Sequence, residues 1–163
     1  ETVYLHGARK SRVIRLLEQN ASVCLTVTIV DALVLARSAF NSSMNYRSAT
    51  IFGKPTLIED LDQKLHAMGV ISEHSMPGRW DELRAPLDNE VKMTGVIAID
   101  IDAASAKISD KPYPADEEHD YATPVWAGIL PMETRYTTLQ DADRLIEGVE
   151  PSAAVSSLEG KKL

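Results

Sequence analysis

Basic and hydroxyl side chains gather where a predicted strand gives way to a predicted helix. Lys10, Ser11 and Arg12 follow a short strand over residues 2–6 that ends at Gly7. The free N–H groups and the dipole of a helix start favour a bound anion, and an arginine beside them can hold a phosphate through two parallel hydrogen bonds. This junction is therefore a candidate phosphate site, with an ordinary solvated turn as the alternative interpretation.

A second polar pair lies on a predicted strand over residues 46–58. Arg47 and Ser48 are consecutive, so their side chains point to opposite faces of the strand and only one can line a pocket. The pair is a candidate for a site. The alternative is an outward Arg47 on an edge strand.

Arg79 follows the helix break at Pro77-Gly78 and is a third candidate. In the structural alternative Arg79 pairs with Asp81 or Glu82, and Trp80 plugs the end of a barrel.

The hydrophobic pattern predicts the elements that position these residues. Alternation predicts strands, a period of 3.6 predicts helices, and Leu61, Leu65, Met68 and Ile71 would form the core face of one helix. The first expected elements are a helix over 9–19, a strand over 22–30 that turns at 31–32 and returns over 33–38, and the strand over 46–58. They are followed by a helix from 59 to about 76, a helix over 88–93, a strand over 95–102 with which 105–109 could pair, a loop over 111–120, and a last strand within 122–136. Many strands with two or three helices predict a mainly β (α+β) fold, an antiparallel barrel with helices outside.

Composition and charge argue against two classes of protein, those that bind nucleic acid and those that span a membrane. The 163 residues carry a net charge of -7, which argues against nucleic-acid binding, and no apolar run has the length of a membrane span. One domain over residues 1–136 and a C-terminal tail over 137–163 are expected. The single Cys24 excludes an internal disulfide, is expected to fill the core, and favours a cytoplasmic location.

Four blocks, in this order and spacing, resemble one known family. They are Tyr-Leu-His-Gly from residue 4, Ser-Met-Asn-Tyr-Arg-Ser from residue 43, Pro-Gly-Arg-Trp-Asp-Glu from residue 77 and Asp-Tyr-Ala-Thr-Pro-Val-Trp from residue 120. Over residues 2–131 the chain resembles the flavin-nucleotide-binding branch of the pyridoxamine 5'-phosphate oxidase-like superfamily, which is related to nitroimidazole-resistance flavoproteins. The resemblance implies an FMN-binding split β-barrel that dimerises with two flavins at the interface. It also implies that an N-terminal helix and the first strands of the barrel are missing from this chain.

The resemblance assigns the phosphate grip to the start of the first helix. Ser11 and Arg12 match a family Arg-Lys pair that holds the flavin phosphate, which leaves Lys10 or Arg9 to replace the first cation. Leu5 and His6 match positions that line the flavin largely through their backbone.

The remaining family positions lie further along the chain. Ser48 stands where a glutamine contacts the flavin, with Arg47 beside it. Trp126 matches a tryptophan that reaches the flavin from the partner subunit, although packing in the core is the alternative.

The resemblance implies an FMN-dependent oxidoreductase that acts as a homodimer on an unidentified small substrate. Pyridoxamine phosphate oxidation itself is not expected, because the family's substrate-contacting arginine and histidine motif is not evident. The alternatives are a non-catalytic flavin-binding or storage protein, an interaction domain without flavin, and a relative that holds haem or a deazaflavin. No metal site is expected, since the acidic run over 116–120 has the character of a solvated loop.

Overall fold

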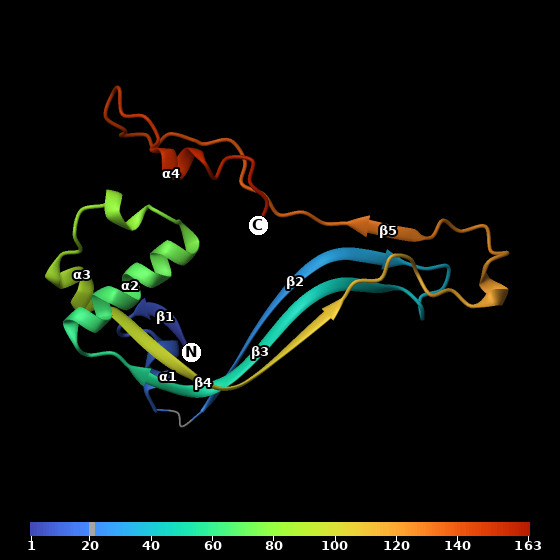
Figure 1. Ribbon diagram of the computed structural model, residues 1–163, viewed down its shortest axis with the longest axis horizontal. Coiled ribbons are helices and arrows are strands. Elements are labelled where there is room, and N and C mark those ends of the chain that lie inside the picture. The colour runs from blue at the N-terminus through green and yellow to red at the C-terminus, as the bar shows by residue number, and fades with distance from the viewer. Residues whose placement is uncertain (20–21) are drawn as a thin grey trace. The chain divides into compact units, whose positions relative to one another are not determined.

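The computed structural model of the protein describes residues 1–19 and 22–163. A five-stranded sheet with the order β1-β4-β3-β2-β5 is its main element (Figure 1). The elements are β1 (Thr2–Ala8), α1 (Arg12–Gln19), β2 (Val23–Leu35), β3 (Ser43–Leu57), α2 (Leu61–Ser75), the 3-10 turn η1 (Trp80–Glu82), α3 (Asp88–Met93), β4 (Thr94–Ser109), the 3-10 turn η2 (Glu118–Asp120), β5 (Gly128–Pro131) and α4 (Ala153–Ser156). The predicted antiparallel, mainly β fold with few helices is confirmed.

The chain forms two compact units. The first unit comprises Glu1–Val23, Phe52–Asp102 and Arg135–Leu163, and the second comprises Cys24–Ile51 and Ala103–Thr134. The division into a domain over 1–136 and a tail over 137–163 stays a prediction, although residues 135–163 belong to the first unit. No helix of the described residues is long and apolar enough to cross a membrane.

The sheet of the first unit carries a helix on each face. β1 runs antiparallel to β4, with Leu5 opposite Ile97 and His6 opposite Val96. Because consecutive side chains alternate, Leu5 and Ile97 face α1 and join the buried Ile14, whereas Val96 faces α2. The two small cores that result hold the end of β1 between the two helices.

Side-chain oxygens fix the starts of these helices. The Ser11 hydroxyl accepts a hydrogen bond from the Ile14 N–H at 3.4 Å, so α1 begins at Arg12 and not at residue 9. The Asp60 carboxylate accepts one from the Gln63 N–H at 2.9 Å and caps α2.

The second unit is built on the β2–β3 hairpin. Hydroxyl pairs join the two strands, with Thr28 and Ser48 3.0 Å apart. β5 pairs with the far half of β2, where Ala32 lies opposite Pro131.

The predicted turn at 31–32 is wrong, because β2 continues without interruption to Leu35. Ala32 pairs with β5 and is buried, which holds this part of the chain extended. The reversal occurs over residues 36–42 instead, where the Ser38 hydroxyl accepts a hydrogen bond from the Asn41 N–H and the Ser42 hydroxyl donates one to the Ser38 carbonyl.

Three further expectations need correction. Residues 95–102 and 105–109 form one strand and do not pair with each other, and the last strand is limited to Gly128–Pro131. On α2, Leu61 is exposed while Lys64 and Ala67 are buried, so the core face lies to one side of the predicted one. Cys24 is exposed and does not fill the core.

Candidate functional site

The start of α1 in the first unit presents two uncompensated cations. Lys10 and Arg12 are exposed, and within residues 1–19 and 22–163 neither has an ion pair or a hydrogen-bonded side-chain partner. Arg9 differs, because its guanidinium donates two hydrogen bonds to the Glu18 carboxylate at 3.1 and 3.2 Å. Ser11 is occupied as the helix cap. An anion at this point would therefore meet two free cations at a helix start, a donor set that suits a phosphate.

Leu5 and His6 lie on β1, just before this junction. The Leu5 side chain packs against the core that contains Ile14, which leaves only its backbone for a ligand. β1 is at the edge of the sheet, so part of its backbone N–H and C=O groups point away from β4. His6 is exposed and lies on the opposite face from Leu5.

Arg47 and Ser48 lie in the second unit and make separate contacts. Arg47 binds the Asp31 carboxylate, with Nη2 2.8 Å from Oδ1 and Nε 3.0 Å from Oδ2. These hydrogen bonds lower the pKa of Asp31 and raise that of Arg47. Ser48 pairs with Thr28. The charge of Arg47 is thus already compensated by Asp31, a residue that was predicted to lie in a turn.

Arg79 belongs to a turn that carboxylates hold in place. Its Nη1 lies 2.8 Å from Glu82 Oε2, as the structural alternative anticipated. The Glu73 carboxylate accepts hydrogen bonds from the N–H groups of Gly78 and Trp80 at 2.7 and 3.0 Å. A hydrogen bond from Ser152 and another from Arg79 lower the pKa of Glu82.

Trp126, in the second unit, is 68% exposed, which excludes the alternative of core packing. Its ring lies over Gly128, where an added Cβ would stand only 2.8 Å from the indole. The absence of a side chain at Gly128 lets the ring lie against the beginning of β5.

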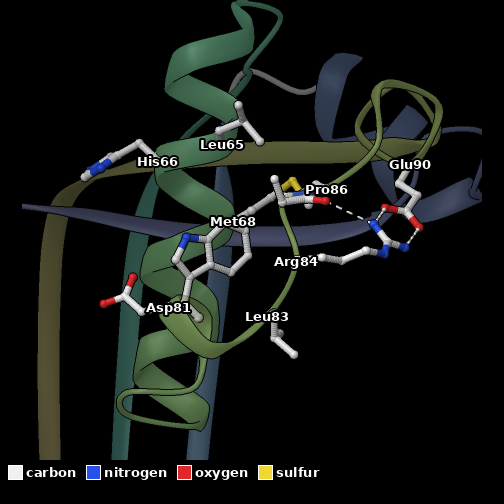
Figure 2. Close-up of a pocket in the computed structure, with 10 residues that line it drawn as sticks. Leu65, His66, Met68, Asp81, Leu83, Arg84, Pro86 and Glu90 are labelled. Carbon is white, nitrogen blue, oxygen red and sulfur yellow. Dashed lines mark hydrogen bonds and ion pairs between the residues drawn. The ribbon is translucent and has the colours of Figure 1, made fainter.

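A pocket of about 800 Å³ lies in the first unit between α2 and the segment that follows it (Figure 2). Figure 2 shows Arg84 and Glu90 at one end of the pocket and His66 and Asp81 at the other. Its walls are mainly apolar: Leu65, Met68, Trp80, Leu83, Ala85 and Pro86. This size and lining are usual for a small-molecule site.

The polar end of the pocket is closed by an ion pair that sequence reasoning missed. Arg84 donates two hydrogen bonds to Glu90, at 2.9 and 2.5 Å, and the Leu87 N–H donates a third at 2.8 Å. Arg84 first, and then Leu87, lower the pKa of Glu90 to about 2. The available signal was Glu90 in the first turn of a predicted helix, three residues after Leu87. Trp80 and Asp81, from the family-like block that begins at residue 77, line this pocket, but none of the predicted flavin-binding residues does.

Two side chains next to the predicted site of the second unit are structural. The buried Asn45 amide donates to the Lys111 carbonyl and accepts from the Lys111 N–H, both at 2.8 Å. Asp116, from the acidic run, binds Arg37 at 2.6 Å with its side chain only 2% exposed. These contacts fasten the loop after β4 to the β2–β3 hairpin region.

Three solved structures provide points of comparison. A flavocytochrome, Anf3 from Azotobacter vinelandii, is 32% identical over 99% of this chain and 74% of its own length, with a TM-score of 0.88. A protein of Mycobacterium smegmatis that is described as binding FAD and heme is 34% identical over 98% of this chain and 78% of its own, with a TM-score of 0.90. A putative 5-nitroimidazole antibiotic resistance protein from Bacteroides thetaiotaomicron is 28% identical over 64% of this chain and 60% of its own, with a TM-score of 0.52.

No curated protein matches the chain. The family model described as Pyridoxamine 5'-phosphate oxidase matches residues 1–108, well over half of the sequence. The chain therefore belongs to the pyridoxamine 5'-phosphate oxidase family and has its flavin-binding fold.

Proposed function

We propose that this protein binds a flavin nucleotide at the start of α1 and acts as a flavin-dependent oxidoreductase on a small substrate. The observation that carries the proposal is the pair of exposed cations, Lys10 and Arg12, which have no carboxylate partner among the described residues. When bound, the flavin supplies the electron transfer, and the chain supplies the phosphate grip and the environment of the ring.

The FMN half of a flavin is the group that these residues would hold. Lys10 and Arg12 would bind its phosphate, and the free backbone edge of β1 at Leu5 and His6 would border the ring. FAD contains the same half, and the relative from Mycobacterium smegmatis is described as binding FAD. FMN is the flavin expected from the sequence, and the binding test below therefore includes both FMN and FAD.

The other predicted residues would make additional contacts with the bound flavin. Ser48 and the exposed Trp126 would approach the flavin ring, Trp126 from the partner of a homodimer. Arg47 and Arg79 would contact flavin only by exchanging Asp31 or Glu82 for it, so we expect their contribution to be smaller than that of Arg12.

Haem is a second candidate ligand. Both relatives with TM-scores near 0.9 are described with haem chemistry, one as a flavocytochrome and one as binding FAD and heme. A protein that holds flavin without turnover, as in storage, is the alternative to the oxidoreductase.

The test is flavin retention. The purified protein is mixed separately with FMN, FAD and haemin, passed through gel filtration, and its absorbance spectrum is recorded. We expect retained flavin colour, and a loss of affinity of about tenfold or more in Arg12→Ala, the usual scale for a charge-assisted hydrogen bond. Arg15→Ala, an exposed arginine one turn along α1, is the matched control and should retain the flavin.

Two results would decide among the alternatives. Bleaching of the bound flavin by NADH or NADPH, with reoxidation by an acceptor, separates a turning-over enzyme from a storage protein. Equal retention by the Arg12 and Arg15 variants would contradict the phosphate grip at α1.

A further inference from the structure

The pocket between α2 and the segment that follows it carries an unpaired carboxylate at one end. Arg79, the nearest cation in the sequence, binds Glu82 at 2.8 Å and leaves Asp81 free. Among the residues that the structure describes, the Asp81 carboxylate has neither an ion pair nor a hydrogen bond. Figure 2 shows Asp81 at the same end of the pocket as His66. This end of the pocket is therefore acidic.

The opposite end of the pocket has no net charge to offer a ligand. Arg84 donates two hydrogen bonds to the Glu90 carboxylate, and each side chain neutralises the other. Of the lysine, arginine, aspartate and glutamate side chains that line the pocket, Asp81 alone remains uncompensated. The pocket thus favours a positively charged ligand group, and the net charge of -7 on the chain acts in the same direction.

The middle of the pocket is apolar and contains a fixed aromatic ring. The Trp80 indole lies over Gly69 of α2, where an added Cβ would meet Nε1 and Cε2 at 3.4 Å. The Glu73 carboxylate, also on α2, accepts a hydrogen bond from the Trp80 backbone N–H at 3.0 Å and holds the turn in place. An indole offers a large apolar surface to a ligand and is the side chain whose ring attracts cations most strongly.

The free carboxylate decides which class of ligand fits. An uncharged apolar ligand would take water away from Asp81 without replacing its hydrogen bonds, which costs free energy. An anionic ligand would be repelled by the same group. A protonated amine would donate charge-assisted hydrogen bonds to the carboxylate while its apolar part covers the rest of the pocket.

We propose that this pocket binds a small hydrophobic amine. The ammonium group pairs with Asp81, and the aromatic or aliphatic body of the ligand packs against Leu65, Met68 and Trp80. The pocket is preformed for such a ligand, because Glu73 fastens one end of the segment that closes it and the Arg84–Glu90 pair fastens the other.

The inference goes beyond the proposed flavin site. Lys10 and Arg12 lie with α1 on one face of the β1–β4 sheet, and α2, which forms a wall of the pocket, packs on the other face. Neither cation lines the pocket. Each proposal can therefore fail without the other.

The experiment uses three probes of similar size and different charge: phenylbutylamine, phenylbutanol and phenylbutyrate. Their dissociation constants are measured by NMR titration of the Trp80 indole N–H signal, which Trp126→Phe identifies by removing the other tryptophan. We expect the amine to bind most tightly and the alcohol about tenfold more weakly, since the alcohol lacks the charge-assisted hydrogen bond. The carboxylate should bind most weakly of the three.

Asp81→Asn removes the charge and keeps the shape of the side chain. It should weaken the amine about tenfold and change the affinity for the alcohol by less than about twofold. Asp102→Asn, which alters an exposed aspartate of β4 outside the pocket, is the matched control and should bind all three probes as the unmodified protein does. As a second readout, the amine should raise the melting temperature of Asp102→Asn more than that of Asp81→Asn.

Several outcomes would overturn the amine site. Equal affinities of the unmodified protein for the amine and the alcohol would do so, as would an amine affinity that Asp81→Asn leaves unchanged. Tighter binding of phenylbutyrate would mean that the pocket selects an anion. Displacement of the amine by haemin, whose propionates are anionic, would assign the pocket to that cofactor instead.

A repeat of the titrations with FMN separates this proposal from the flavin proposal. If the protein retains no flavin but binds the amine through Asp81, the flavin proposal fails and the amine site stands. If the protein retains flavin through Arg12 but does not prefer the amine, the amine site fails and the flavin proposal stands.

Discussion

The Glu90 carboxylate accepts hydrogen bonds from both terminal nitrogens of Arg84 and from the Leu87 N–H, which lower its pKa from the ordinary 4.5 to about 2. A carboxyl group whose pKa is lower in the folded state contributes stability above its unfolded pKa, and that contribution disappears as the pH falls from about 4.5 to about 2. We predict that Arg84→Met returns the pKa of Glu90 most of the way to 4.5. An NMR titration that follows the carboxyl carbon of Glu90 measures this pKa.

Arg79→Met provides the control for this titration, since it removes an arginine of the same segment that binds Glu82 and not Glu90. A pKa that stays near 2 in Arg84→Met would mean that the Leu87 N–H alone accounts for the shift.

Gly53 lies where the backbone of β3 comes close to β4. A Cβ added there would stand 2.1 Å from the Asp100 carbonyl oxygen and 2.8 Å from Ile99 Cγ2, so the strands would have to separate. We predict that Gly53→Ala lowers the free energy of unfolding by about 1–3 kcal/mol, the usual cost of overpacking. Urea denaturation measures this change.

Gly69 on α2 is the matched control for Gly53. An added Cβ there would meet Trp80 at 3.4 Å, an ordinary contact, and alanine favours a helix over glycine by up to about 1 kcal/mol. Gly69→Ala should therefore be neutral or stabilising. Equal destabilisation by both substitutions would show that the β3–β4 approach is not the cause.

At the scale of the element, α2 depends on the cap at its first turn. The Asp60 carboxylate accepts the Gln63 N–H and satisfies a donor that the helix itself cannot. We predict that Asp60→Ala lowers the free energy of unfolding by about 1 kcal/mol, measured by urea denaturation. Asp60→Asn should lower the free energy of unfolding much less, because asparagine can also cap the helix. Equal losses in the two variants would contradict capping as the role of Asp60.

Elements were predictable from the sequence where the signal is local. The helix Asp88–Met93 has the predicted bounds, because its acidic first turn and the strand that follows are visible in the nearby residues. The turn at Asp31 was wrong because the contact that keeps β2 extended, Ala32 with Pro131, comes from a strand about a hundred residues later. Alternation predicts that a strand exists but not where its pairing ends.

For the candidate site, too, local features were predictable from the sequence and long-range contacts were not. Order and spacing of motifs predict Lys10, Arg12, Arg47 and Trp126 as site residues, yet nothing local distinguishes the free Arg12 from Arg47, whose partner lies sixteen residues away. Likewise, only tertiary packing buries Lys64, and no local pattern predicts that burial. Sequence therefore predicted the cations but not which of them are already paired.

For the whole molecule, the surface of the second unit bears on the predicted homodimer. Val27 and Ile29 lie on one face of β2 and are 57% and 47% exposed. Met44, Leu130 and the large ring of Trp126 are also exposed in this unit. Neighbouring exposed apolar side chains, such as Val27 and Ile29, are usual for a surface that associates with another protein.

We predict that the protein sediments as a homodimer and that Ile29→Glu, which places a charge on this face of β2, shifts it toward the monomer. Thr26→Glu adds the same charge to the opposite face and should leave the dimer intact, because side chains alternate along a strand. Sedimentation velocity at several protein concentrations measures the change. If Trp126 reaches the flavin of the partner, the Ile29→Glu monomer should also lose flavin, while its far-UV circular dichroism stays that of the folded chain. A monomeric unmodified protein, or equal dissociation by both glutamate variants, would contradict an interface on this face.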